Sequence, residues 1–391
     1  MPQTSISASV RVGNPGRLPR SGLGRGGSGE SNICQDVGMG RWGSSRRGIS
    51  LGPKVALASA LLLGTLVAPV SAAAGAVEPA EGVLNEAVET VRANQRFPVG
   101  ATAFIDVSVA TLWREPRIHR QRDRASLGNP VRLGRWNKRL RTADHRRWLT
   151  GQVQTQALYG QQVLVRAVKK SWVRVAVLDQ PEPQDKAGYP GWLPARQLVP
   201  DTGQLPEIAD STEHLVVTAQ RVQLRTPTGR VAVSYGTRLL PHTAEEPSSG
   251  RIAVHTTRGI GSVTESAVAG PKIPSVASIL ADGKKFIGLR YLWGGLSDWG
   301  MDCSGLIWNV FRTHGMTIPR DADPQYRSGK QVKLKRIKPG DMLFWGTEKH
   351  VHHVALYVGG DKMLEAPDAS GRVRIVPIRW RELIGARRYL D

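Results

Sequence analysis

Short stretches in which apolar residues recur at every second position fill the middle of the chain. The clearest of them are residues 103–107, 163–165 and 172–177. Successive side chains of a strand point to opposite faces, and residues that favour turns separate the stretches, so the pattern predicts short strands. A plainer series of the same kind runs from 214 to about 268. We therefore expect two small all-β units, over residues 98–205 and 206–270.

Helical spacing of apolar residues occurs on both sides of this β region. On the N-terminal side the spaced residues are Val83, Leu84, Ala87 and Val91. Their separation by three or four positions predicts a short amphipathic helix within residues 77–97. On the C-terminal side, prolines at 271 and 274 indicate a linker. A last domain is expected at 275–391, and a helix over residues 276–286 opens it.

An apolar run at residues 55–70 indicates an export signal. Arg47 and Lys54 precede the run, and the alanines at 72–74 follow it. A basic, an apolar and a small-residue region in this order are typical of a signal peptide. The run is short for a membrane span, and a retained anchor is the alternative. We expect residues 1–76 to be a disordered leader with a signal peptide, and the mature protein to be secreted, periplasmic or associated with the cell wall.

The chain is strongly basic, with a formal charge of +22 from 54 lysines and arginines against 32 acidic residues. A positive field of this size favours polyanions such as nucleic acid, anionic lipid or acidic cell-wall polymers. The sequence has no recognisable nucleic-acid-binding motif and no zinc-ligand spacing. We expect no nucleic acid, metal or cofactor. Anionic cell-wall polymers stay open as partners, beside a merely solvated basic surface.

Cys303 is the only cysteine left after removal of the leader, since Cys34 lies within it. No disulfide is then possible. Residues 306–311 (Leu-Ile-Trp-Asn-Val-Phe) place large apolar side chains on one helical face, and Asp302 is a favourable N-cap. Cys303 would lie in the first turn, where free N–H groups and the helix dipole lower a thiol's pKa. That position suits a nucleophile, whereas a buried core cysteine is the alternative.

Three histidines within residues 350–353 begin a strand, turn and second strand. Alternation puts His352 on the face of the larger aliphatic residues, which marks the core, and His353 on the face expected to point toward a cleft. Glu365 on the returning strand comes near enough to orient the imidazole of His353. A metal site is the alternative, but two of the histidines would face opposite ways and no acidic cluster completes a ligand set.

Five ordered motifs are together similar to those of one family of cysteine peptidases. They are 291–295 (Tyr-Leu-Trp-Gly-Gly), 302–306 (Asp-Cys-Ser-Gly-Leu), 318–322 (Ile-Pro-Arg-Asp-Ala), 338–344 (Lys-Pro-Gly-Asp-Met-Leu-Phe) and 353–359 (His-Val-Ala-Leu-Tyr-Val-Gly). Through them the domain at 275–391 resembles the NlpC/p60 cysteine peptidases. The resemblance implies a papain-like α+β fold. It also implies hydrolysis of cell-wall stem peptides, commonly between γ-D-glutamate and a diamino acid.

The same resemblance implies roles for single residues. Cys303 is the nucleophile, His353 is its base, and Glu365 is the third polar residue, a position where the family more often has histidine. Tyr291 and the backbone N–H of Cys303 face the oxyanion that develops on the scissile carbonyl. The pocket for the D-glutamyl group is lined by Asp302, Ser304 and Arg320. For these three, a plain structural role as helix cap or local ion pair is the alternative.

The two β units resemble bacterial SH3-like barrels in the order of the stretches 159–163, 171–175 and 191–193. Two such barrels before this catalytic domain are similar to a subgroup of γ-D-glutamyl-L-diamino acid endopeptidases that act on short muropeptides with a free L-Ala terminus. In that subgroup a tyrosine and an acid of the first barrel meet the free amine. Tyr159 matches the tyrosine. The acid falls in Arg122-Asp123-Arg124-Ala125, where Asp-Glu-Pro is expected, so Asp123 is the candidate acid.

The reaction expected of this site is acyl transfer to water. The Cys303 thiolate attacks the γ-glutamyl carbonyl, His353 protonates the leaving amine, and water hydrolyses the acyl-enzyme. One alternative is a non-catalytic wall-binding protein. Another is an amidase or acyltransferase on the same scaffold, since a triad specifies acyl transfer but not the acceptor. We expect peptidoglycan peptides as the substrates.

Overall fold

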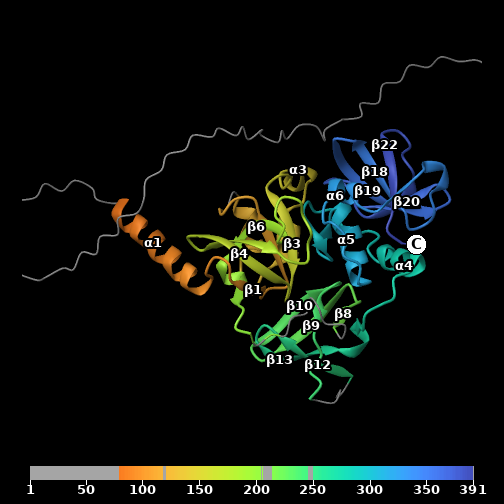
Figure 1. Cartoon of the computed structure of the whole chain (residues 1–391). Helices are drawn as coiled ribbons and strands as arrows, with labels where there is room; N and C mark the ends of the chain where they lie inside the picture. The colour runs from red at the N-terminus through yellow and green to blue at the C-terminus, as the bar shows by residue number, and fades with distance from the viewer. Residues whose placement is uncertain (1–78, 118–119, 204, 206–213, 245–249, 391) are drawn as a thin grey trace, which may run out of the picture. The chain divides into compact units, whose positions relative to one another are not determined.

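The computed structural model describes residues 79–390, apart from 118–119, 204, 206–213 and 245–249 (Figure 1). The expected leader and signal peptide at 1–76 lie outside the described residues. In the part of the chain that is described, no helix is both long enough and apolar enough to cross a membrane.

Helix α1 (Pro79–Arg96) occupies most of the segment expected to be helical. Ala93 in this helix and Phe97 just after it are buried, and Phe97 packs in the core of the first β domain. Val88 and Val91 are 47% and 54% exposed. The helix therefore packs on the next domain mainly through its C-terminal end.

The first β domain (residues 98–200) is built on one seven-stranded sheet. Its strands are β1 (Thr102–Ile105), β2 (Val109–Trp113), β3 (Val153–Leu158), β4 (Gln162–Lys169), β5 (Trp172–Val177), β6 (Tyr189–Pro194) and β7 (Leu198–Pro200). Their order in the sheet is β3-β2-β6-β5-β4-β1-β7. In the described strands β3 and β7 are edges that do not pair with each other, so hydrogen bonds do not close this sheet into the expected barrel.

The insert between β2 and β3 (residues 114–152) packs against the catalytic domain. It contains η1 (Gln121–Ser126), α2 (Leu133–Arg139) and α3 (Ala143–Arg147). Trp136 of α2 is fully buried, and its ring centroid lies 6.2 Å from that of Trp113. Both belong to an apolar cluster that also contains Cys303 and Leu306. Although the insert is rich in arginine, its apolar side thus contributes to the core around the expected nucleophile.

The second β domain (residues 214–269) has two small sheets. The first has the order β10-β9-β13-β12 and the second β11-β8-β14. The strands are β8 (Leu215–Val217), β9 (Arg221–Thr226), β10 (Gly229–Ser234), β11 (Arg238–Leu239), β12 (Arg251–Thr256), β13 (Gly259–Thr264) and β14 (Val268–Ala269), with η3 (Glu265–Ala267) before the last. The core of this domain also contains Tyr159, which follows β3 of the first β domain.

The catalytic domain (residues 275–390) packs helices on a six-stranded sheet of order β17-β22-β18-β19-β20-β21. Its helices are α4 (Val276–Lys284), α5 (Cys303–Thr313), α6 (Ala322–Arg327) and η4 (Leu334–Arg336). Its strands are β15 (Leu296–Ser297), β16 (Gly300–Met301), β17 (Lys330–Val332), β18 (Met342–Thr347), β19 (His350–Gly359), β20 (Lys362–Glu365), β21 (Arg374–Pro377) and β22 (Leu383–Arg388). Both α5 and α6 contact β19, beside the sheet drawn in blue in Figure 1. This is a mixed α and β domain, in which the backbone of Val354 in β19 reaches Cys303 at the start of α5.

Candidate active site

The N-terminus of α5 presents Cys303 in its first turn. Asp302 is the N-cap, and its Oδ1 accepts a hydrogen bond from the backbone N–H of Gly305 at 2.7 Å. A Cβ atom on Gly305 would lie 2.2 Å from the carbonyl oxygen of Gly295. Only glycine therefore lets the helix begin this close to the preceding loop. Cys303 is 8% exposed, so the thiol lies at the edge of the core.

The expected lowering of the thiol's pKa is wrong for this structure. Burial, followed by the neighbouring Asp302 carboxylate, raises the pKa of the Cys303 thiol to about 12. Hydrogen bonds from the backbone N–H groups of Val354 and Ser304 favour the thiolate without offsetting the burial. The thiol is thus protonated at neutral pH. The contact with Val354 puts the thiol beside the residue that follows His353.

His353 lies in β19 opposite Trp345 of β18, and the centroids of the two rings are 5.4 Å apart. His353 is 6% exposed, so its imidazole is buried beside Trp345, and the cleft expected on this face stays a prediction. Its Nε2 lies 2.9 Å from Oε2 of Glu365. The structure therefore brings together the base and the acid singled out in the sequence. With Nε2 engaged, Nδ1 is the ring nitrogen left for another partner.

Glu365 is held by two arginines that the sequence did not indicate. Oε1 accepts hydrogen bonds from Nε and Nη2 of Arg374 at 3.0 and 2.9 Å and from Nη1 of Arg379 at 2.9 Å. Burial alone would raise the pKa of Glu365, but the hydrogen bond and charge of His353, with Arg379, lower it to about 2. Glu365 is therefore a carboxylate throughout the neutral range, as a group that orients an imidazole and stabilises its cation must be.

Tyr291 lies beside the segment that leads into α5. Its backbone forms a parallel bridge with Met301, two residues before Cys303, and its N–H donates to the carbonyl of Gly371 at 3.1 Å. The residue is 5% exposed and belongs to the same apolar cluster as Cys303. Tyr291 thus lies in the same core as the thiol, and the oxyanion role of its hydroxyl stays a prediction.

Arg320 organises a second network beside the nucleophile. Its fully buried guanidinium donates from Nη1 to Oδ1 of Asp302 at 3.1 Å and to Oγ of Ser304 at 3.0 Å, and from Nη2 to Oδ2 of Asp302 at 2.9 Å. The remaining donors reach Oγ1 of Thr155 at 3.1 Å and the carbonyl of Gly295 at 3.3 Å. All five N–H groups of an arginine are then used. Arg320 therefore positions Asp302 and Ser304, with no donor left for a substrate.

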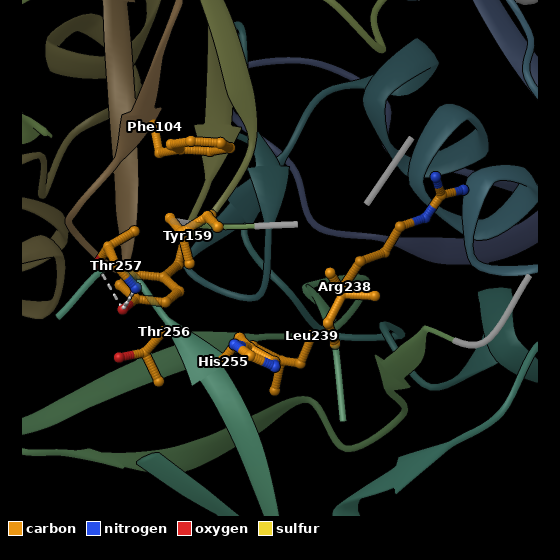
Figure 2. Close-up of a pocket in the computed structure, with 10 residues that line it drawn as sticks. Phe104, Tyr159, Arg238, Leu239, His255, Thr256 and Thr257 are labelled. Atoms are coloured by element: carbon orange, nitrogen blue, oxygen red, sulfur yellow. Dashed lines mark hydrogen bonds between the residues drawn. The ribbon is translucent and has the colours of Figure 1, made fainter. Parts of the chain in front are cut away.

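The two residues of the first β domain expected to meet a free amine are engaged elsewhere. The hydroxyl of Tyr159 lies 2.6 Å from Oγ1 of Thr257 in the second β domain, and Figure 2 shows the ring in that neighbourhood. Asp123 is 1% exposed, and its carboxylate accepts from Arg120 and from Nε1 of Trp136. The structure thus joins Tyr159 to the second β domain and Asp123 to the insert.

Other residues of the first β domain do reach the catalytic domain, and sequence reasoning missed them. The hydroxyl of Tyr189 donates to Oδ2 of Asp321 at 2.6 Å, next to Arg320. Glu182 is 9% exposed, and its Oε2 is buried without a hydrogen-bond partner among the described residues. Burial and then the charge of Asp321 raise the pKa of Glu182 to about 7. The backbone of Gln184 and the charge of Arg320 act against this rise, so only the second carboxylate oxygen is left for a further cation. The sequence carries no local pattern that could have found this pair.

A metal centre finds no support in the described ranges of the chain, where no group of three or more His, Cys, Asp or Glu side chains is placed to hold an ion. His350 and His352 flank His353 on the strand, and His352 does not lie on the buried face where alternation placed it. His352 is exposed, and its pKa is lowered, by partial burial and then by the two neighbouring histidines. The two extra histidines are thus flanking residues of the strand.

Comparison with known proteins decides the family. The NlpC/P60 family model matches residues 288–384. A relative from Bacillus cereus named γ-D-glutamyl-L-lysine dipeptidyl-peptidase is 38% identical over 309 residues, which cover 74% of this chain and 91% of the relative. The chain belongs to the NlpC/P60 family. A Bacillus subtilis protein of the same name is 36% identical and covered over 96% of its length.

A solved structure extends the NlpC/P60 relationship beyond the catalytic domain. It is an NlpC/P60 family protein from Bacillus cereus that aligns with a TM-score of 0.69 and 36% identity, over 74% of this chain and all of that one. The matched length includes β domains as well as the NlpC/P60 domain. Within residues 288–384 lie Tyr291, Cys303, His353 and Glu365.

Proposed function

We propose that this NlpC/P60 protein is an exported cysteine peptidase that hydrolyses the bond between γ-D-glutamate and a diamino acid in peptidoglycan stem peptides. The observation that carries the proposal is the pairing of His353 with Glu365 at 2.9 Å, together with the hydrogen bond from the backbone of Val354, the residue after His353, to the Cys303 thiol in the first turn of α5. The name shared by the two Bacillus relatives supports the chemical class of the bond.

The geometry supports a concerted use of the catalytic residues. Because the pKa of Cys303 is raised to about 12, its proton moves to Nδ1 of His353 as the sulfur attacks the carbonyl carbon. The carboxylate of Glu365 stabilises the imidazolium that forms. The backbone N–H of Cys303 and Tyr291 take the oxyanion, His353 returns the proton to the leaving amine, and water releases the acyl group.

A free N-terminal amine on the substrate fits the junction of the first β domain with the catalytic domain. Glu182 offers an unpartnered carboxylate oxygen, and Asp321 lies close enough to raise the pKa of Glu182. Tyr189 fixes Asp321 from the first β domain. An ammonium group would balance this acidic pair, so we assign amine recognition to Glu182 and Asp321 in place of Asp123 and Tyr159. Asp302 and Ser304, aligned by Arg320, remain the groups proposed to face the glutamyl unit.

The remaining parts of the proposal concern the setting of the enzyme. We take the two β domains to be variants of the SH3-like barrel, because each places short antiparallel strands around a small core of its own. We take residues 1–76 to direct export and to be removed without leaving a membrane anchor. The net charge of +22 favours anionic cell-wall polymers as further partners.

Mass spectrometry of short peptides tests this function. The substrates are L-Ala-γ-D-Glu-diamino acid peptides with a free or an acetylated amine, incubated with the protein and with Cys303→Ala. Cleavage after glutamate by the wild type alone is the expected result, and acetylation should slow it. Transfer of the acyl group to an added amine instead of water would indicate an acyltransferase. Absence of cleavage of both peptides and of intact wall would favour a non-catalytic wall-binding protein.

A further inference from the structure

The insert of the first β domain encloses an open cavity of about 500 Å³. Besides Gln121, its lining is cationic or basic throughout: Arg122, Arg124, Lys138, Arg139, Arg141 and His145. These residues come from η1, from α2, from the turn after it and from α3. No described carboxylate lines the cavity, and none of its lining residues belongs to the networks around Cys303.

The acidic residues nearest in sequence are already paired with other arginines. Asp123 points into the core, where it binds Arg120 and the indole of Trp136. Asp144 pairs with Arg147 at 2.5 Å. The charges that line the cavity are therefore not balanced by the described part of the protein, and they create a concentrated positive field.

The backbone that carries these charges is held firmly. Arg146 donates from Nη1 to the carbonyl of Leu140 at 2.7 Å and from Nε to the carbonyl of Ala369 at 2.6 Å. The guanidinium of Arg120 lies 3.8 Å from the ring centroid of Trp148. Three elements thus converge on the cavity from fixed positions, and little backbone has to be ordered when a ligand binds.

The positive charges around the cavity affect the pKa of His145. Its Nδ1 is buried without a hydrogen-bond partner among the described residues. Burial, and then the charges of Arg122 and Arg120, lower the pKa of this imidazole, and Arg141 acts in the same direction, opposed only by the carbonyl of Arg139. An anion in the cavity would offset the repulsion from the arginines.

We propose that this cavity binds the phosphate groups of an anionic, phosphodiester-linked polymer of the cell wall. The cationic side chains come from several elements, and a phosphate group can accept hydrogen bonds from several directions. Two N–H groups of one arginine can also bond two oxygens of the same phosphate. A polymer with a charge on every repeat also engages several separated cations at once. The polymer's identity as a wall component rests on the proposed function, whereas phosphate recognition rests on the cavity itself.

Binding of synthetic poly(glycerol phosphate) to the purified protein, measured by calorimetry at two salt concentrations, tests the proposal. The variant Arg124→Ser/Lys138→Ser/Arg141→Ser removes three cations from the cavity. Arg225→Ser/Arg230→Ser/Lys284→Ser removes three exposed cations elsewhere, so both variants have the same net charge. We expect the dissociation constant to rise about 30- to 100-fold for the first variant and less than about threefold for the second. The wild type should lose affinity as salt increases.

A titration of His145 and a comparison with other polyanions test whether binding is specific to this cavity and to phosphate. Titration of the His145 resonances should show a higher pKa when the polymer is present. Equal loss of binding in both triple variants, an unchanged His145 pKa, or no binding by the wild type would overturn the proposal. Tighter binding of polygalacturonate or duplex DNA than of the phosphate polymer would also overturn it. Hydrolysis of the short soluble peptide should be the same in both variants, so that failure of the cavity is separable from failure of the peptidase.

Discussion

Two networks of charged residues lie near Cys303, and they differ in how exposed their arginine side chains are. In one, Glu365 joins His353 to arginines whose side chains are 50% and 45% exposed. In the other, Arg320 is fully buried and uses every donor on Asp302, Ser304 and neighbouring groups. In the first network, two partly exposed arginines contact the same carboxylate, which is paired with His353, the residue proposed to gain and lose a proton. The second is a closed scaffold, in which loss of one member leaves a buried charge without compensation.

Of the replacements considered, that of Arg320 should lower the stability of the protein most. In Arg320→Leu, the Asp302 carboxylate stays buried without its cation, so we expect the free energy of unfolding to fall by about 3–5 kcal/mol. Arg379→Leu is the matched change in the other network, and there we expect about 1 kcal/mol or less, because the side chain is half exposed. Urea unfolding measures both. Equal destabilisation would erase the distinction between the two networks.

Glu365→Gln should damage catalysis more than stability. The amide cannot stabilise an imidazolium as a carboxylate does, and it can hold His353 in the wrong tautomer, so we expect kcat to fall by about 100-fold. Peptide hydrolysis measured alongside thermal unfolding separates the two effects. An unchanged kcat would mean that His353 does not need the negative charge of Glu365.

Glu182→Gln sharpens the comparison at the edge of the buried network. If Glu182 receives the substrate amine, KM for the free-amine peptide should rise about tenfold while KM for the acetylated peptide stays the same. The pKa of about 7 for Glu182 means that its carboxylate is lost as pH falls through 7. KM of the wild type should therefore rise on the acid side of pH 7, and the variant should lack this dependence. Equal KM changes for both peptides would assign Glu182 a structural role.

Arg374→Ala should give the smallest effect. The side chain is half exposed, and Arg379 still contacts Glu365, so we expect a change of less than about 1 kcal/mol in stability and of about threefold or less in kcat. The double variant Arg374→Ala/Arg379→Ala measures the redundancy directly. A single replacement as damaging as the double one would show that the two arginines act as one unit.

The pairing of base and acid was accessible from the sequence because both lie in one short hairpin. Alternation along 350–358 separates His353 from its neighbours, and the turn at 359–361 brings Glu365 back beside it. The N-cap at Asp302 was accessible for the same reason, since it depends on a local pattern. Features of this kind are set within about fifteen residues of chain.

Features that depend on contacts between distant segments were not accessible. The pKa of Cys303 moves in the opposite direction to the prediction because burial outweighs the helix terminus, and burial is a property of the packed core. Arg374, Arg379 and Glu182 are charged residues without any pattern, and only the fold shows what they touch. Tyr159 was assigned by similarity to a position whose side chain packs here against the second β domain.

The apolar cluster shared by the insert and the catalytic domain limits how this protein can be divided. Trp136 and Leu140 lie in the same core as Leu306 and Trp308. Excision at the linker near residue 275 would keep the packing of α5 on β19 but would uncover the part of this core that Trp136 and Leu140 cover. The linker therefore separates the two domains in sequence but not in their packing. A truncated protein that keeps this core intact has to include the first β domain as well as the catalytic domain.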